Sequence, residues 1–177
     1  MTLDKKIDRL LRNVPDFPKP GIMFKDITPV LQHAETFKAI IDDFKNRTIP
    51  NRVDYIAGIE SRGFIFGAAL AHALGCGFLT LRKPGKLPWK TVRATYQLEY
   101  GSDAIEMHED SVNKGDRVIV FDDLLATGGT ATAASHLLRD AGADIIANYF
   151  VVELADLKGR EKLEVAGFRK IEALLKY

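Results

Sequence analysis

The chain has 177 residues, 46% of them hydrophobic, and a formal net charge of +1 from 25 basic and 24 acidic side chains. This length and apolar content predict a single globular domain and exclude a disordered chain. The near-zero charge argues against nucleic-acid binding, and no apolar run approaches the roughly 20 residues that cross a bilayer. Because Met1–Lys6 lacks a signal-peptide core and Cys76 is the single cysteine, we expect a cytoplasmic protein without an internal disulfide.

Apolar residues at helical spacing predict a helix over residues 3–14, which the three prolines and one glycine of 15–21 end. Residues 83–91 contain three lysines, two prolines and a glycine, and predict an exposed, mobile loop. A strictly alternating strand over 92–100 then turns into an antiparallel partner near Ile105. The other expected elements are helices over 34–47, 61–74, 128–141 and 157–166, and strands over 53–59, 78–81, 117–121 and 144–152. This alternation predicts an α/β domain with a parallel sheet.

The segment from Val118 to Thr130 is the most informative part of the chain. A short apolar strand ends in two adjacent acids, Asp122 and Asp123, and a small, hydroxyl- and glycine-rich loop follows before the next helix. Free backbone N–H groups and a partial positive charge at a helix N-terminus suit an anion. The two acids instead suit a neighbouring polyol or metal. A ribose 5-phosphate, with vicinal hydroxyls beside a phosphate, matches both halves.

This segment resembles the phosphoribosyl-pyrophosphate motif of the type I phosphoribosyltransferases. The resemblance implies that Asp122 and Asp123 hold the ribose hydroxyls and that the loop wraps the 5′-phosphate. The loop residues are Ala126, Thr127, Gly128, Gly129 and Thr130. A strand end followed by an ordinary helix cap is the plainer alternative. Two other phosphate-binding motifs, G-x-x-x-x-G-K-[ST] and G-x-G-x-x-G, do not occur in the sequence.

The segment Ala57–Phe64 resembles the pyrophosphate loop of the same family. Arg62 falls in the first turn of a predicted helix, where the helix dipole disfavours a cation unless a bound anion compensates it. The resemblance implies that Glu60, Ser61 and Arg62 form a pyrophosphate-binding site, with Arg62 acting in catalysis. It also implies a cis peptide bond between Glu60 and Ser61. The alternative is a strand, a serine cap and a helix without a ligand.

The segment Arg82–Pro88 resembles the catalytic loop of the family branch that uses adenine, although lysine-rich loops are usually only solvated. The resemblance implies a lid that excludes water, with Arg82, Lys83 and Lys86 facing pyrophosphate and Lys86 acting in catalysis. The nearby Leu98–Gly101 matches the same branch. It implies that Glu99 assists proton transfer at the purine ring, although a Glu on a hairpin is by itself often just exposed.

The segment Phe17–Ile27 resembles the adenine-binding hood of that branch. Met23, Phe24 and Lys25 are the residues that the resemblance assigns to the base, with an aromatic ring stacked on the purine. Many relatives have Arg where this chain has Lys25, a harmless change if the backbone makes the contact and a significant one if a guanidinium does. A buried Phe24 with no role in binding is the alternative.

The resemblance as a whole implies an enzyme of purine salvage that transfers a 5-phosphoribosyl group from 5-phosphoribosyl 1-diphosphate to adenine, giving AMP and pyrophosphate. It implies a twisted parallel sheet flanked by helices, with a small N-terminal hood (mainly 1–33), a core (about 34–155), a flexible β-hairpin loop and a C-terminal tail (156–177). It further implies Mg²⁺ held mainly by the substrate, with no metal ligands of the protein, and a homodimer without nucleic-acid or membrane partners. Hypoxanthine, guanine or xanthine as the base, and a non-catalytic sensor of the sugar diphosphate, stay open.

Overall fold

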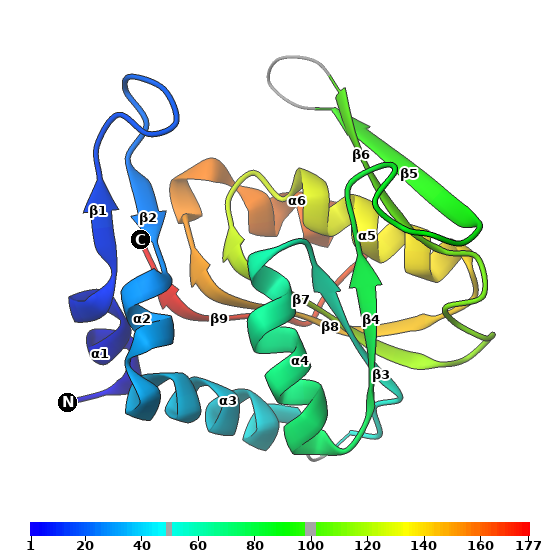
Figure 1. The fold of residues 1–177 in the computed structure, drawn as a ribbon, viewed down its shortest axis with the longest axis horizontal. Coiled ribbons are helices and arrows are strands. Elements are labelled where there is room, and N and C mark those ends of the chain that lie inside the picture. The colour runs from blue at the N-terminus through cyan, green and yellow to red at the C-terminus, as the bar shows by residue number, and fades with distance from the viewer. Residues whose placement is uncertain (49–50, 98–101) are drawn as a thin grey trace.

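A parallel sheet of five strands forms the centre of the computed structural model, which describes residues 1–48, 51–97 and 102–177 (Figure 1). The strands are β3 (Tyr55–Ile59), β4 (Gly77–Leu81), β7 (Arg117–Leu125), β8 (Asp144–Glu153) and β9 (Ile171–Lys176). Their order across the sheet is β4–β3–β7–β8–β9, with every neighbouring pair parallel. The order therefore reverses between β3 and β7, and open parallel sheets bind ligands outside the carboxyl ends of the strands at such a point.

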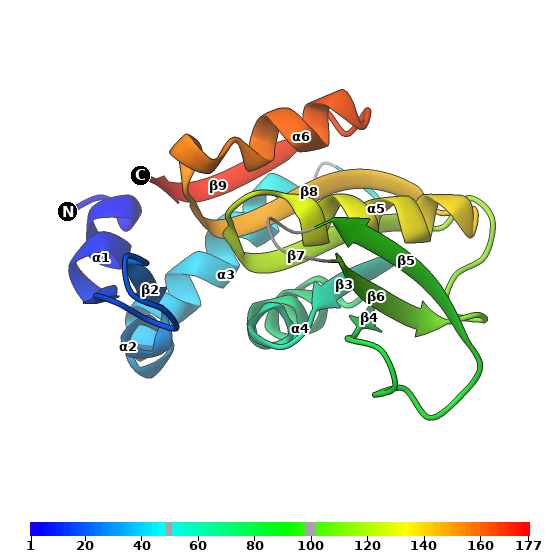
Figure 2. The ribbon, with the colours of Figure 1, turned by 90° about the horizontal axis from the view of Figure 1, so that it is seen from above.

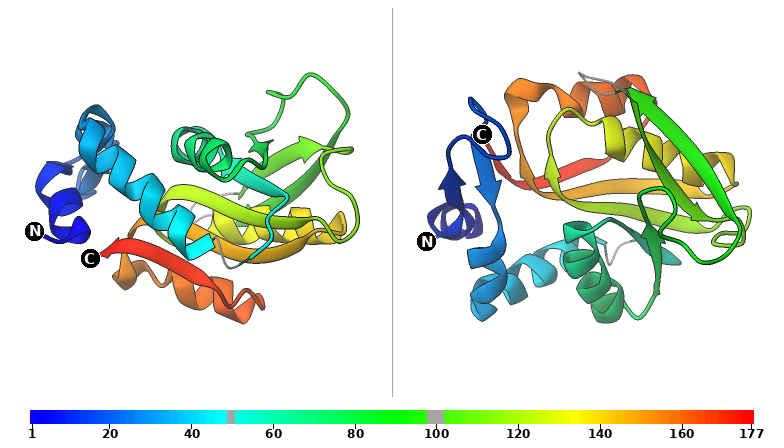
Figure 3. Two further views of the ribbon diagram at one scale, coloured as in Figure 1. Left: turned by 90° about the horizontal axis from the view of Figure 1, so that it is seen from below. Right: turned by 45° about the horizontal axis from the view of Figure 1, so that its top comes forward.

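Helices cover both faces of this sheet (Figures 2 and 3). The helices that pack on the sheet are α3 (Ala34–Thr48), α4 (Arg62–Leu74), α5 (Gly129–Asp140) and α6 (Gly159–Val165). A short 3₁₀ turn, η1 (Ala155–Leu157), precedes α6. The central strand β7 contributes to two apolar clusters in alternation. Val118 and Val120 pack with α5 and α6, whereas Ile119 and Phe121 pack with α3 and α4. This arrangement confirms the predicted α/β fold.

The N-terminal segment forms a small hood beside the sheet. It consists of α1 (Leu3–Leu10), β1 (Arg12–Val14), β2 (Phe24–Asp26) and α2 (Thr28–Gln32), and β1 pairs antiparallel with β2. The prediction of a helix through residue 14 was wrong, because α1 ends at Leu10. Val14 precedes Pro15, and the residue before a proline favours extended backbone, which β2 stabilises here by pairing.

An antiparallel hairpin, β5 (Thr91–Gln97) and β6 (Ser102–His108), lies at the other end of the molecule from the hood (Figure 1). The predicted alternation is confirmed over residues 92–96, because Val92, Ala94 and Tyr96 are less exposed than the residues between them, and residues 98–100 of the predicted strand lie outside the described residues. Tyr96 and Ile105 join the apolar cluster that contains α5. The hairpin is therefore fixed on the helix that follows the two acids.

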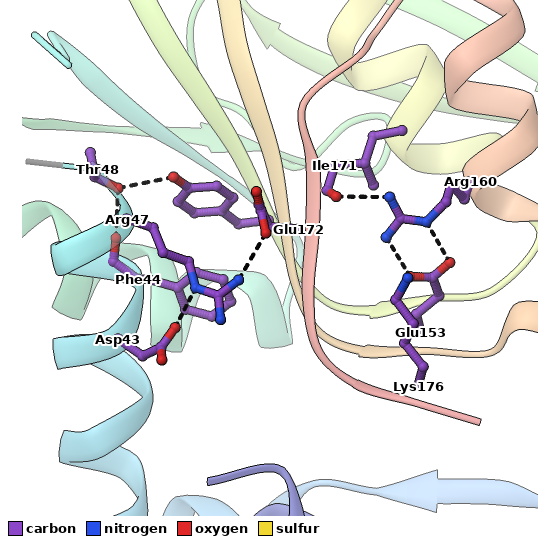
Figure 4. Close-up of polar contacts among 10 residues, drawn as sticks. Asp43, Phe44, Arg47, Thr48, Glu153, Arg160, Ile171, Glu172 and Lys176 are labelled. Atoms are coloured by element: carbon purple, nitrogen blue, oxygen red, sulfur yellow. Dashed lines mark hydrogen bonds and ion pairs between the residues drawn. The ribbon is translucent and has the colours of Figure 1, made fainter. Parts of the chain in front are cut away.

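Two strand predictions need correction. The strand expected over 117–121 continues to Leu125. The long β8 pairs with β7 beyond the two acids, and its last residue, Glu153, lies opposite Leu125. No strand was expected after residue 152, yet β9 forms the edge of the sheet beside β8. An ion pair from Arg47 of α3 to Glu172 of β9, with 2.8 Å between Nη1 and Oε2, ties this edge to the helical layer (Figure 4).

Candidate active site

The segment Ala126–Thr130, named here the phosphate loop, leaves the carboxyl end of β7 and leads into α5. A small hollow of about 80 Å³ opens there, lined by Asp122 and by residues 124–131. Gly128 has a φ of +76°, a left-handed conformation that glycine adopts without steric cost. The hollow faces the N-terminus of a 12-residue helix, where unpaired backbone N–H groups favour an anion.

The structure brings the predicted pyrophosphate loop and the two acids together. A second hollow of about 310 Å³ is lined by Glu60, Ser61, Arg62, Asp122, Asp123 and Leu124. The Arg62 Nε lies 2.8 Å from Oδ2 of Asp123, whose side chain is 5% exposed. The α4 helix starts so close to β7 that a Cβ on Gly63 would meet the carbonyl oxygen of Phe121 at 2.6 Å. The peptide bond between Glu60 and Ser61 is cis, as expected.

The two adjacent acids differ in their surroundings. Burial and the neighbouring Asp123 carboxylate raise the pKa of Asp122 well above its ordinary value. The Asp122 Oδ1 also accepts a hydrogen bond of 2.9 Å from the backbone N–H of Asp123. The two side chains present neighbouring oxygen atoms at the larger hollow, which suits two adjacent sugar hydroxyls.

The carboxylate of Glu60 contacts three basic residues of the predicted lid, Arg82, Lys83 and Lys86. Lys86 Nζ lies 2.6 Å from one carboxylate oxygen, and Arg82 Nε donates to the other at 3.3 Å. The backbone N–H of Lys83 donates to the same oxygen at 3.0 Å. Burial alone would raise the pKa of Glu60, but hydrogen bonds from Lys86, Lys83 and Arg82 outweigh it and lower the pKa to about 2. Glu60 therefore stays ionised and holds these cations beside the larger hollow.

The rest of the lid is exposed and lies along the hairpin. The backbone N–H of Gly85 donates to the buried carboxylate of Glu106 at 3.0 Å, which Arg93 also contacts. Trp89, the single tryptophan of the chain, is 61% exposed in this segment. The exposure predicted for the loop over 83–91 is confirmed at residues 84–86 and 88–91, whereas Lys83 and Leu87 are partly buried.

The side chain of Lys83 contacts the hairpin in this structure. Its Nζ lies 2.8 Å from the hydroxyl of Tyr96 and forms an ion pair with Asp103. The same Tyr96 hydroxyl accepts a hydrogen bond of 3.1 Å from the hydroxyl of Thr130 in the phosphate loop. A polar network thus connects Lys83, the hairpin and the phosphate loop.

The predicted base-binding residues lie where the hood meets this site. Phe24 packs edge-on against Phe17, with ring centroids 5.0 Å apart, and the guanidinium of Arg62 lies 5.2 Å from the centre of its ring. Met23 is 53% exposed beside it. The Nζ of Lys25 lies over the ring of Tyr177, 3.6 Å from its centre. The structure therefore brings Phe24 to the pyrophosphate loop and turns the Lys25 side chain toward the C-terminal residue.

Glu99 lies outside the described residues, between the ends of β5 and β6. Three residues of the site were not singled out from the sequence: Leu124, which lines both hollows, and Tyr96 and Asp103, which contact Lys83. Leu124 directly follows the two acids, so its position in the chain was an available signal. The predicted antiparallel pairing places Tyr96 opposite Asp103, but their contacts with Lys83 depend on how the preceding loop folds onto the hairpin, which no local motif shows.

No helix among the described residues is both long and apolar enough to cross a membrane. Within the same residues, no three histidine, cysteine, aspartate or glutamate side chains form a group that could hold a metal ion.

Comparison with known proteins supports this interpretation. A sequence profile of the phosphoribosyl transferase domain matches residues 26–172. The adenine phosphoribosyltransferase of Idiomarina loihiensis is 54% identical over 155 residues, which are 88% of this chain and 88% of that protein. The adenine phosphoribosyltransferase of Anaeromyxobacter dehalogenans is 54% identical over 167 residues, with coverage of 94% and 95%.

Solved structures agree. The crystal structure of adenine phosphoribosyltransferase from Thermoanaerobacter pseudethanolicus has a TM-score of 0.94 and 47% identity, covering 99% of this chain and 100% of that one. The Saccharomyces cerevisiae enzyme, complexed with an imino-altritol bisphosphate and adenine, has a TM-score of 0.91 and 42% identity, covering 98% of both chains. The chain therefore belongs to the phosphoribosyltransferase family, as its sheet and its site at the carboxyl edge indicated. Within that family, these relatives group it with the adenine phosphoribosyltransferases.

Proposed function

We propose that the two hollows at the carboxyl ends of β3 and β7 form the active site of this enzyme. The enzyme transfers the 5-phosphoribosyl group from 5-phosphoribosyl 1-diphosphate to adenine, giving AMP and pyrophosphate in purine salvage. A bond forms between a ring nitrogen of adenine and the anomeric carbon of the sugar, while the bond from that carbon to pyrophosphate breaks. The observation that carries the assignment is the contact between Arg62 and Asp123, which joins the pyrophosphate loop to the sugar-binding acids.

For the ribose 5-phosphate, Asp122 and Asp123 bind the sugar hydroxyls and the phosphate loop binds the 5′-phosphate. The loop offers backbone N–H groups, two glycines and the hydroxyls of Thr127 and Thr130 around its hollow. Positive charge develops on the anomeric carbon as pyrophosphate leaves, and a nearby carboxylate stabilises such charge. The carboxylate of Asp123 supplies that negative field, because it is buried beside the larger hollow.

For pyrophosphate, the binding groups are Ser61, Arg62, Arg82, Lys83 and Lys86. Glu60 acts through these cations, because its carboxylate holds Arg82 and Lys86 rather than an anion. Arg62 and Lys86 neutralise the leaving group as its charge develops, and this is their catalytic role. Lys83 reaches pyrophosphate only after it leaves Asp103 and Tyr96, so its role requires a movement of the lid.

For adenine, the stacking ring is Phe24, and Met23 and Lys25 complete the base site. Because the side chain of Lys25 lies on Tyr177, its contact with the base is through the backbone. Glu99 assists removal of the ring proton, by resemblance to the family. Adenine bound in the related yeast structure supports this choice of base.

Enzymes of this family generally use Mg²⁺ with the sugar diphosphate. Mg²⁺ keeps several waters and binds through one or two carboxylates together with phosphates. In this site the phosphate and hydroxyl oxygens of the substrate would supply most of the ligands, because Asp122 and Asp123 are assigned to the sugar hydroxyls. When bound, the metal would neutralise part of the charge on the leaving pyrophosphate.

We further propose that the enzyme is a cytoplasmic homodimer that binds neither nucleic acid nor membranes. The single cysteine and the net charge of +1 support the location and the absence of such partners. Ile65 on the outer side of α4 is 44% exposed, one turn from Arg62, and offers an apolar contact for a second copy.

One assay tests the proposed function. Pyrophosphate release is measured with the full chain, 5-phosphoribosyl 1-diphosphate and Mg²⁺, adding adenine, hypoxanthine, guanine or xanthine in turn. Release that is fastest with adenine supports the proposal. A preference for another base would overturn the base assignment, and no release with any base would make the protein a non-catalytic sensor of the sugar diphosphate.

A further inference from the structure

Gly159, the first residue of α6, lies against the backbone of the phosphate loop. A Cβ added to Gly159 would meet the carbonyl oxygen of Ala126 at 2.3 Å and the backbone nitrogen of Gly128 at 2.9 Å. A Cβ added to Gly128 would meet the carbonyl oxygen of Gly159 at 2.6 Å. None of these three distances leaves space for a side chain, so the two backbones are in direct contact.

Arg160 holds this start of α6 in place. Its Nε and Nη2 donate to the two carboxylate oxygens of Glu153 at 2.9 and 2.6 Å, and its Nη1 donates to the carbonyl oxygen of Ile171 at 2.8 Å (Figure 4). The Glu153 side chain is 4% exposed and is also 3.5 Å from Nζ of Lys176. A two-pronged contact with a buried carboxylate fixes the guanidinium in one orientation. Arg160 therefore connects the start of α6 to the carboxyl end of β8 and to the first residue of β9.

The same region is connected to the strand that leads into the phosphate loop. The backbone N–H of Leu154 donates to the carbonyl oxygen of Leu125 at 2.9 Å. The side chains of Leu125 and Leu163 belong to one buried cluster. The loop thus has α5 on one side and the start of α6 on the other.

We propose that Gly159 and Arg160 are positioning residues for the phosphate loop and set the affinity for the 5′-phosphate without touching it. Backbone N–H groups bind a phosphate well only when the loop holds them in one arrangement, and a glycine-rich loop does not hold itself. The backbone of Gly159 restricts the conformation of the phosphate loop by direct contact, and Arg160 holds Gly159 against the loop. This inference rests on the proposed role of the loop in binding the 5′-phosphate.

The test compares the affinities of the full chain for AMP and adenosine, which differ only in the 5′-phosphate, by titration calorimetry. The Gly159→Ala variant is expected to lower the preference for AMP by about 10- to 100-fold and to leave adenosine affinity unchanged. Gly167→Ala is the matched control at the other end of α6. It strains a backbone with a φ of +92°, yet its Cβ would meet nothing nearer than Nη1 of Arg139 at 3.7 Å, so it should keep the AMP preference.

A second variant keeps the proposal testable if Gly159→Ala does not fold. Arg160→Lys removes the two-pronged contact but leaves Lys176 near the buried Glu153, and it should also lower the AMP preference. If either variant folds and still prefers AMP over adenosine as strongly as the wild type does, the positioning role is overturned. A wild type that does not distinguish AMP from adenosine would instead refute the proposed role of the phosphate loop.

Discussion

The carboxylate of Asp123 is buried and contacts Arg62, so its charge is held close to the sugar-binding hollow. Asp123→Asn removes the charge but keeps the size of the side chain. We expect kcat/KM for the sugar diphosphate to fall by about 10- to 100-fold, the usual cost of losing a charged hydrogen bond. Initial rates of AMP formation measure this, with the exposed Asp140→Asn as a control. Kinetics close to those of the wild type would remove Asp123 from the ribose contact.

Glu99 is expected to act on the proton of the purine ring. If so, Glu99→Leu lowers kcat more than it weakens adenine binding, because the proton moves only in the reaction step. Steady-state rates at varied adenine concentration separate the two effects. Glu109→Leu, an exposed glutamate beyond the end of β6, serves as the control. A change confined to KM would make Glu99 a binding residue.

Glu60 gives stability that depends on pH. Its pKa of about 2 lies below the ordinary value of 4.5, so its contribution is fully present above pH 4.5 and is lost as the pH falls toward 2. We expect wild type to be more stable than Glu60→Gln at pH 7 and the difference to shrink by pH 3. Urea unfolding of both proteins at the two pH values measures it. A difference that does not change with pH would mean that the hydrogen bonds of Glu60 do not depend on its charge.

Among single residues, the sequence predicted those site residues that lie within short local motifs. Asp122, Asp123 and Arg62 converge in the structure because their segments leave neighbouring strands at one edge. Their partners were not predictable. The pairing of Glu60 with Lys86, and of Lys83 with Asp103, joins residues about 20 or more positions apart in the chain, and only the folded sheet and hairpin bring them together.

The lid is the element whose removal should change the outcome of the reaction. We expect deletion of residues 84–90 to abolish transfer or to increase hydrolysis of the sugar diphosphate, because water then reaches the anomeric carbon. The ratio of AMP to free ribose 5-phosphate, measured by chromatography of the products, reports this. An unchanged ratio would show that the segment is only a solvated loop.

Helices and strands with a regular hydrophobic periodicity were predictable from the sequence, whereas those that depend on pairing with distant segments were not. The alternation of β5 and the apolar face of α3 gave the correct elements. The edge strand β9 contains Glu, Ala, two Leu and Lys, residues that favour helices, so only its pairing with β8 explains it. The early end of α1 likewise depends on the pairing of β1 with β2.

The whole molecule is expected to pair with a second copy. Sedimentation equilibrium should give a mass of two chains, each of 19.7 kDa, at concentrations where the enzyme is active. Burial of Ile65 and of the neighbouring surface of α4 would stabilise such a dimer by removing apolar area from water. A fully active particle with the mass of one chain would refute the proposed dimer.

The position of Trp89 has a practical consequence. The indole is exposed on the segment expected to close over the reactants, and the chain has no other tryptophan. Its fluorescence therefore originates from one known place, and a blue shift on adding substrates would report the loss of water around the ring. Closure could then be timed by stopped-flow mixing on the unlabelled enzyme.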